Sequence, residues 1–416
     1  FRAMPEIGYR RDSGSLDLDV RYKLNAVQYS DTDDLNSVQH QLNARALWKF
    51  MPDWLGLEVK AARTQQALDP VGATNLSGLL GDTNQVDTDT YSIGPQLRHE
   101  FGSTLLKGHY NFSKTKYDLR GQVAPGLVRD ADDQDGYVSI GTMHDTSRFG
   151  WQAEAVHQRT TYGTASLRPF QYDRVKVGVG VPVGGRWSMI AAAGMESNVA
   201  KSVSKGGLDS AAWEAGVRWS GPQNATKFEA AIGHRYFGNS YRVELSREAK
   251  LLTFKARYQE EPTTETARLL RALPTNFLPG SDFAVNAPFL LKEGNLSVLL
   301  SGARTSVEIG AFDRKRDFAA VASAATAARG TDAQRGVFGR AVRRLNSRTD
   351  LVLDGSWEEV KLGSGGQYKQ SEAGLELVRE VGRETDIVVG VRHWDRNGTG
   401  NGFKVTAGYV QVAKKF

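Results

Sequence analysis

The residue types that do most protein chemistry are present, but their spacing assembles no recognisable site. Hydrolysis by a nucleophilic serine needs serine, histidine and a polar orienting group together, and no local signature of that kind occurs. The histidines show neither an HExxH motif nor paired metal-ligand spacing. They fall on separate segments: His40, His99, His109, His144, His157, His234 and His393. We therefore predict no catalytic residues, no metal site and no cofactor, and interpret the protein as not an enzyme.

One acidic segment resembles a calcium-binding loop. Asp130-Ala-Asp-Asp-Gln-Asp-Gly136 has alternating carboxylates, but Ala131 occupies a ligand position and no closing glutamate follows at the right distance. We interpret it as a solvated loop, with loose divalent binding as the alternative.

Composition excludes several classes of protein. With no cysteine, the chain has no disulfides, thiolate metal sites or covalent c-type haem. No run of about 18 apolar residues occurs, which excludes a helical membrane protein. The net charge is +6, from 53 basic and 47 acidic residues. That charge allows acidic polymers or anionic lipids as neighbours, whereas dispersed basic residues and the lack of an RNA-binding motif argue against nucleic acid.

The dominant pattern is a two-residue alternation. In Leu16–Ala26, leucine, valine and tyrosine alternate with aspartate, arginine, lysine and asparagine, which a strand separates onto two faces and a helix would mix. The pattern recurs along the chain, for example at Tyr137–Asp145, Gly150–Tyr162 and Thr349–Lys361. We count about 20 strands, within a range of about 18 to 22.

The connections alternate in length. Turn-sized ones such as Gly102-Ser103 and Asn346-Ser347 mostly alternate with longer polar ones such as Ala67–Asp87 and Glu261–Phe283. Together these features predict an all-β fold, a transmembrane antiparallel up-and-down β-barrel with short periplasmic turns and long extracellular loops. Residues 1–416 are interpreted as a single outer-membrane barrel domain. Residues 1–14 are a possible extra strand or periplasmic lead-in; if they form a strand, the strand number is odd and we expect a partner strand before Phe1.

The last segment, Phe403–Phe416, alternates to the end of the sequence, and we assign Tyr409 and Phe416 to the barrel-closing terminus. Aromatic residues gather where strands meet turns, which predicts an interfacial girdle. Its members are Trp48, Phe50, Trp54, Phe101, Phe149, Trp151, Trp187, Trp219, Phe228 and Trp394.

The polar faces of the strands predict a lumen lined by charges of both signs. The main interpretation is a hydrated wall of ion pairs, and the alternative is a lane for a charged or hydroxyl-rich polymer. The predicted pore-lining residues are Asp17, Asp19, Arg21, Lys23, Arg45, Glu58, Lys60, Arg98, Glu100, Glu214, Arg218, Glu229, Lys255, Arg257, Asp350, Asp354, Glu372 and Arg392.

Four segments resemble a known family: Leu16–Gln28, His40-Gln-Leu-Asn-Ala44, Pro52-Asp-Trp-Leu55 and Tyr91–His99. Between His40 and Gly102 they spell HxLNA, PDWL and YSxxPxLRHxFG. This pattern is similar to the outer-membrane β-barrel family associated with exosortase/PEP-CTERM exopolysaccharide systems, and weaker similarity covers nearly the whole chain. The resemblance implies a barrel of the bacterial outer membrane that is encoded near exopolysaccharide assembly genes, and it supplies no catalytic residues.

These observations predict a porin-like channel for exopolysaccharide export, a passive conduit. Expected partners are outer-membrane lipid and lipopolysaccharide, a polysaccharide export protein, and the polysaccharide chain in transit. One alternative is a structural sheath barrel that encloses a partner such as a multihaem electron conduit, and another is a barrel enzyme acting on lipid or polymer.

Two loop segments have helical character, Thr264–Leu273 with a capping threonine and the alanine-rich Asp317–Ala328. We interpret both as ordered extracellular loops, with inward folding that narrows or plugs the pore as the alternative.

Overall fold

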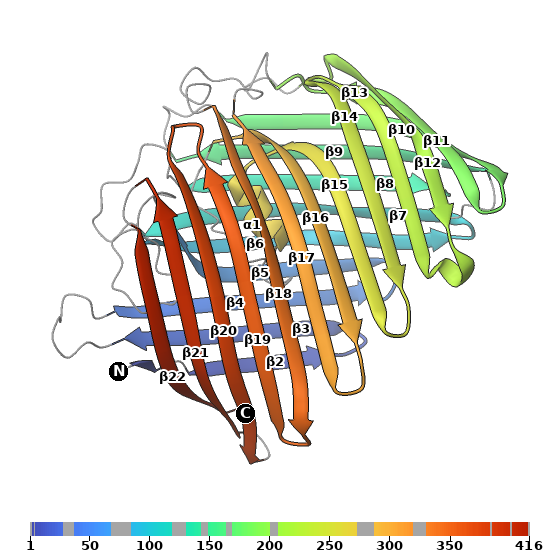
Figure 1. Ribbon diagram of the computed structural model, residues 1–416. Coiled ribbons are helices and arrows are strands. Elements are labelled where there is room, and N and C mark those ends of the chain that lie inside the picture. Colours follow the sequence, from blue (N-terminus) through green and yellow to red (C-terminus); the bar gives the residue numbers. More distant parts are fainter. Residues whose placement is uncertain are drawn as a thin grey trace.

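The computed structural model describes residues 2–3, 5–27, 37–67, 85–118, 130–142, 149–163, 169–199, 207–272, 287–318, 330–382, 385–399 and 402–414. Most of the backbone in these ranges is extended, in one sheet of 22 strands (Figure 1). The first eleven strands are β1 (Arg2–Ala3), β2 (Glu6–Asp12), β3 (Leu16–Val27), β4 (Ser37–Met51), β5 (Leu55–Ala67), β6 (Gln85–Phe101), β7 (Thr104–Asp118), β8 (Ala131–Gly141), β9 (Gly150–Tyr162), β10 (Phe170–Gly184) and β11 (Trp187–Glu196).

The remaining strands are β12 (Ser210–Ser220), β13 (Thr226–Arg235), β14 (Gly238–Glu248), β15 (Leu252–Thr263), β16 (Phe289–Ser301), β17 (Thr305–Asp317), β18 (Thr331–Asn346), β19 (Thr349–Lys361), β20 (Gln367–Gly382), β21 (Thr385–Gly398) and β22 (Phe403–Lys414). A 3₁₀ turn covers Pro222–Asn224 and one helix, α1, covers Glu265–Ala272. No helix in the described ranges has the length and apolar character needed to cross a bilayer.

Each strand pairs antiparallel with the next one along the chain, from β3–β4 through to β21–β22. β1 and β2 pair with successive parts of the same strand, β3, so together they take one position in the wall. The 22 described strands therefore occupy 21 positions. This confirms the predicted all-β, up-and-down fold and the extra strand near the start of the sequence, which is β2.

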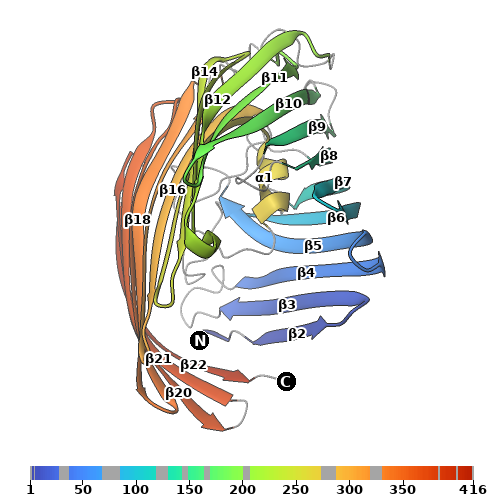
Figure 2. The ribbon, with the colours of Figure 1, turned by 90° about the vertical axis from the view of Figure 1, so that its right-hand side faces the viewer.

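The two faces of the sheet differ in chemistry. On adjacent strands, Ile309 and Val337 point to the convex side and are 57% and 50% exposed. The neighbouring register positions Glu308 and Arg340 point to the other side, which curls around α1 (Figures 1 and 2). We call these the outward face and the lumen face. Large exposed apolar side chains on the outward face belong next to hydrocarbon, and a polar lumen face belongs next to water.

The connections sort to the two ends of the wall. Short ones such as 102–103, 302–304 and 347–348 join strands at one end, here called the turn end. At the opposite end, called the loop end, lie the strand ends that flank the longer connections 28–36, 68–84, 119–130, 264–288 and 318–330. The predicted alternation of turns and loops is therefore confirmed.

Glycines on the lumen face let the wall bend between β10 and β13. A Cβ on Gly194 would lie 2.0 Å from the carbonyl oxygen of Val175, and one on Gly216 would lie 2.1 Å from that of Ala230. Gly233 makes a similar approach of 2.2 Å to Trp213. A strand pair that is strongly coiled crowds its concave side, so only glycine fits at these points. Figure 2 shows the sheet turning over through β10, β11 and β12.

The two edges of the sheet face each other without joining. β22 pairs with β21 and β2 pairs with β3, and no ladder joins β22 to β2 within the described ranges. In both views the two edges stand next to each other (Figures 1 and 2). Closure of the barrel by the last strand thus stays a prediction. Tyr409 is described on β22, and Phe416 lies outside the described residues.

One strand was misplaced by the sequence patterns. The segment Asp130–Gly136 was interpreted as a loop and Tyr137–Asp145 as the strand, but β8 runs from Ala131 to Gly141. The acidic residues alternate between faces, and those on the lumen face have partners there. Asp133 accepts a hydrogen bond from Thr160, and Asp135 contacts His109 at 3.0 Å. Carboxylates held by neighbouring strands suit a strand, so the interpretation of this segment as a solvated loop was wrong.

The two faces can be tested with one charge. We expect Val337→Arg, on the outward face, to destabilise the folded protein in lipid vesicles by about 2–4 kcal/mol, because arginine would face hydrocarbon. Ser356→Arg, on the lumen face of the adjacent strand, is the matched control and should change stability little. Urea titration of the vesicle-inserted protein measures both. Equal losses for the two variants would contradict the assignment of faces.

Candidate functional site

The strand register places all the predicted pore-lining residues on the lumen face. Residues that pair across adjacent strands point to the same face of the sheet, and the pairings connect all of these residues to the face that curls around α1. They are Asp17, Asp19, Arg21 and Lys23 on β3, Arg45 on β4, Glu58 and Lys60 on β5, Arg98 and Glu100 on β6, Glu214 and Arg218 on β12, Glu229 on β13, Lys255 and Arg257 on β15, Asp350 and Asp354 on β19, Glu372 on β20, and Arg392 on β21.

Many of these charges neutralise one another across the strands. Arg45 Nε lies 2.6 Å from Glu58 Oε1, and Lys60 Nζ lies 2.8 Å from the other oxygen of the same carboxylate. Glu58 is only 7% exposed. A carboxylate that is removed from water to this degree needs opposite charge beside it. The lumen wall near β4 and β5 is therefore a paired surface.

A second network links strands that are not direct neighbours. The carboxylate of Glu214 on β12 forms ion pairs with Lys176 of β10 at 3.0 Å and with Arg242 of β14 at 3.2 Å. Glu229 on β13 pairs with Arg218 at 2.7 Å and also contacts Arg242. Such contacts between alternate strands are possible because the wall bends here and brings lumen-facing side chains together.

A third network surrounds Arg392 on β21. Its guanidinium lies 2.6 Å from Glu372, 3.0 Å from Asp354 and 3.0 Å from Glu376. Tyr409, which the sequence assigned to barrel closure, donates its hydroxyl to Glu376 at 2.5 Å. This hydrogen bond of the Tyr409 side chain therefore lies on the lumen face.

A short segment crosses the lumen at the loop end. It comprises residues 263–268, here called the strap, and leads from β15 into α1 (Figure 2). The hydroxyl of Thr266 donates to Asp133 Oδ1 at 3.0 Å, and Thr264 Oγ1 lies 3.3 Å from Thr160 Oγ1. Because Asp133 and Thr160 belong to β8 and β9, these bonds tie one side of the wall to another.

The other side of the strap is held by charge. Glu265 is fully buried; it lies 2.9 Å from Arg268 within α1 and 3.7 Å from Arg316 on β17. Thr264 Oγ1 also accepts the amide of Ala267 at 3.3 Å, which caps the helix. The strap thus spans from β15 and β17 to β8 and β9. The described part of this loop therefore folds inward, as the alternative interpretation expected, and a narrowing of the pore stays a prediction.

Of the second loop with helical character, Asp317–Ala328, the structure describes only Asp317 and Phe318. The alternation predicts strands at Thr305–Asp313 and Arg335–Leu345, but β17 continues to Asp317 and β18 begins at Thr331, so both strands are longer than predicted. The alanine-rich helix predicted at Asp317–Ala328 lies outside the described residues beyond Phe318.

Sequence reasoning missed the polar residues that meet only through folding. The hydrogen bonds that join Asp133, Thr160 and the strap threonines span 27 to 133 positions, so nothing in the sequence marks these contacts. Arg316 was missed because its strand was ended too early. Extending the alternation past Asp313 would have found it.

Aromatic side chains gather on the outward face near the turn end. Trp48, Phe101 and Phe149 are 54%, 49% and 62% exposed, as expected of a girdle at a membrane interface. Trp394 was assigned to the same girdle, and that assignment was wrong. It faces the lumen and is only 3% exposed, because its position on β21 follows Arg392 by two residues.

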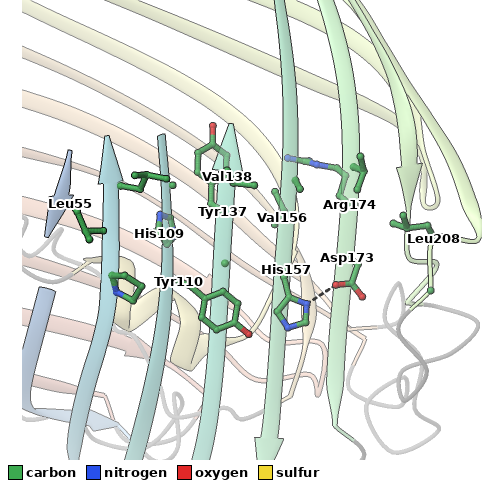
Figure 3. Close-up of a pocket in the computed structure, with 17 residues that line it drawn as sticks. Leu55, His109, Tyr110, Tyr137, Val138, Val156, His157, Asp173, Arg174 and Leu208 are labelled. Atoms are coloured by element: carbon green, nitrogen blue, oxygen red, sulfur yellow. Dashed lines mark hydrogen bonds and ion pairs between the residues drawn. The ribbon is translucent and has the colours of Figure 1, made fainter. Parts of the chain in front are cut away.

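A cavity of about 700 Å³ lies on the outward face over β5 to β10 (Figure 3). Its lining is mainly apolar, and Gly136 leaves space for the ring of Tyr110, whose Cδ2 would meet an added Cβ at 2.8 Å. The Tyr110 ring lies parallel to that of His157, which contacts Asp173 at 2.6 Å. An apolar trough on this face suits hydrocarbon chains, whereas the lumen face suits hydrated solutes.

No family model and no curated protein matches the chain. Among solved structures, it is similar to BauA, the ferric preacinetobactin receptor from Acinetobacter baumannii, with 10% identity over 100% of this chain and 72% of that one, TM-score 0.44. It is similar to the FrpB iron transporter from Neisseria meningitidis, with 8% identity, coverages of 98% and 74%, TM-score 0.46. It is also similar to OmpT, an outer membrane protein of Vibrio cholerae, with 8% identity, coverages of 87% and 99%, TM-score 0.32.

The chain itself shows the features that define its class. An antiparallel up-and-down sheet that is apolar and exposed on its convex face, polar on its concave face and edged by aromatic residues is built for a lipid bilayer. The protein is an outer-membrane β-barrel protein.

The strap can be tested through its hydroxyl bonds. We expect Thr266→Val to remove the bond to Asp133, loosen the strap by about 1–3 kcal/mol, and leave the rest of the wall unchanged. Hydrogen exchange of a peptide that covers 263–268 should speed up accordingly. Thr305→Val, at the exposed turn end of β17, is the matched control. Unchanged exchange in Thr266→Val would show that the strap is held by other contacts.

Proposed function

We propose that the protein is a passive outer-membrane channel for a hydrophilic polymer, and that this polymer is an exopolysaccharide leaving the cell. The single observation that carries the proposal is the lumen face, where charged and hydroxyl side chains continue around the wall opposite an apolar outward face. The turn end is then periplasmic and the loop end extracellular.

The charge arrangement favours transit over tight binding. Carboxylates such as Glu58, Glu214 and Glu229 are each already paired with basic neighbours. A wall of paired charges offers many hydrogen-bond partners and little net field. A sugar chain can therefore exchange partners along it and still be released. The resemblance to barrels beside exopolysaccharide assembly genes supports the same cargo.

The strap favours a channel over a sheath. It crosses the lumen near the loop end and is anchored on both sides by buried groups, with Glu265 and Thr266 both fully buried. A barrel that enclosed a full-length partner protein would need this space. We therefore infer a conduit with a constriction near its extracellular mouth, and a periplasmic polysaccharide export protein as the partner at the turn end.

The proposal predicts conduction that depends on the strap. In planar bilayers, the purified protein should open ion-conducting channels, and the double variant Glu265→Gln/Thr266→Val should conduct more, because the strap is less firmly held. Thr305→Val should conduct like the unmodified protein. The absence of any conductance would contradict a channel.

The cargo is tested in cells. A strain that lacks the protein should lose surface exopolysaccharide, and the unmodified gene should restore it. Retention of normal amounts of surface polymer in the deletion strain would contradict export through this protein, whatever the conductance in bilayers.

A further inference from the structure

A second cavity, of about 370 Å³, lies on the lumen face at the turn end. It is lined from two sides, by β7 to β9 and by β12 to β14. Only β10 and β11 separate these two groups of strands in the wall. Lumen-facing Gly178 and Ala192 on those strands carry little side chain, so the two sides meet around a hollow. Its volume is that of an ordinary small-molecule site.

The lining is chemically suited to a sugar. Ser139, Ser220 and Ser246 bring hydroxyl groups from β8, β12 and β14, and Gln152 adds an amide. Tyr137 presents an aromatic ring at the same cavity, stacked on His109 with ring centroids 5.8 Å apart. Several hydrogen-bonding groups around one aromatic surface match a ring that carries hydroxyls on its edge and C–H groups on its faces.

The charges in this cavity are only partly neutralised. Arg218 and Glu229 neutralise each other at 2.7 Å. Lys107 and Lys227 also line the cavity, are exposed, and form no ion pair or hydrogen bond with a described residue. Glu244 is likewise exposed and makes no such contact with the described part of the chain. Two unpaired ammonium groups against one carboxylate leave an excess of positive charge.

From this juxtaposition we infer that the cavity is an entry subsite for an acidic sugar unit, such as a uronic acid residue of the polymer. The carboxylate of the sugar is held by Lys107 and Lys227, and its hydroxyls exchange hydrogen bonds with the serines, Gln152 and Glu244. The subsite stands at the turn end, the opposite mouth from the strap. This inference rests on the proposed function, and it adds the class of monomer that enters the channel.

The test compares an acidic with a neutral oligomer. Oligogalacturonate and maltohexaose are added to the turn side of channels in a planar bilayer, and the affinity of each is measured from its block of the ion current. We expect Lys107→Gln/Lys227→Gln to weaken block by oligogalacturonate about tenfold or more, since charge-assisted contacts are lost. Block by maltohexaose should stay the same. Lys250→Gln, in the exposed turn between β14 and β15, is the matched control and should change neither.

Equal block by oligogalacturonate in the double variant and the unmodified protein would overturn the subsite. So would an equal weakening of block by both oligomers, because that result would mean a general change of the lumen. If no channel conducts, the proposed function fails separately. Titration of the detergent-solubilised protein with digalacturonate by calorimetry then decides the subsite, which requires binding that the double variant loses.

Discussion

The whole structure depends on one constraint, the need to pair every backbone amide and carbonyl sideways with a neighbouring strand. A hydrocarbon environment offers no water for unpaired groups, so a wall of this kind must be continuous along each strand. The ladders from β3 to β22 meet that need, with each strand paired to its sequence neighbour. Because pairing uses the backbone alone, side chains are left to alternate freely between lipid and lumen.

That freedom explains how a chain with 24% charged residues stands in a membrane. The charges lie on one face, and neighbouring strands place opposite charges within reach. Glu58, Glu214 and Arg392 are each bound by two or more partners. A neutralised wall removes the cost of isolated buried charges, and under the proposed function it would release a polyelectrolyte in transit.

The two mouths of the lumen have different structures. At the loop end, the strap is buried and bonded to both sides of the wall. At the turn end, the bend at β10 and β11 brings two groups of strands around a polar cavity with unpaired Lys107 and Lys227. The proposed conduit would therefore have an acceptor at one mouth and a constriction at the other.

The alternation of residues along the chain was enough to predict the class of fold and to tell which side chains face the lumen. A strand that alternates polar and apolar residues has one possible wet face, so Asp17, Glu58 and Arg392 could be assigned to it before any pairing was known. Alternation is a local pattern, and it mispredicts a segment whose polar side chains are bound by residues of neighbouring strands. It mistook the start of β8, because Asp133 and Asp135 look solvated until Thr160 and His109 are placed beside them. The strap's contacts and the turn-end cavity follow from the tertiary structure, since the partners of the strap and the lining of the cavity come from strands far apart in sequence and meet only when the sheet has curled.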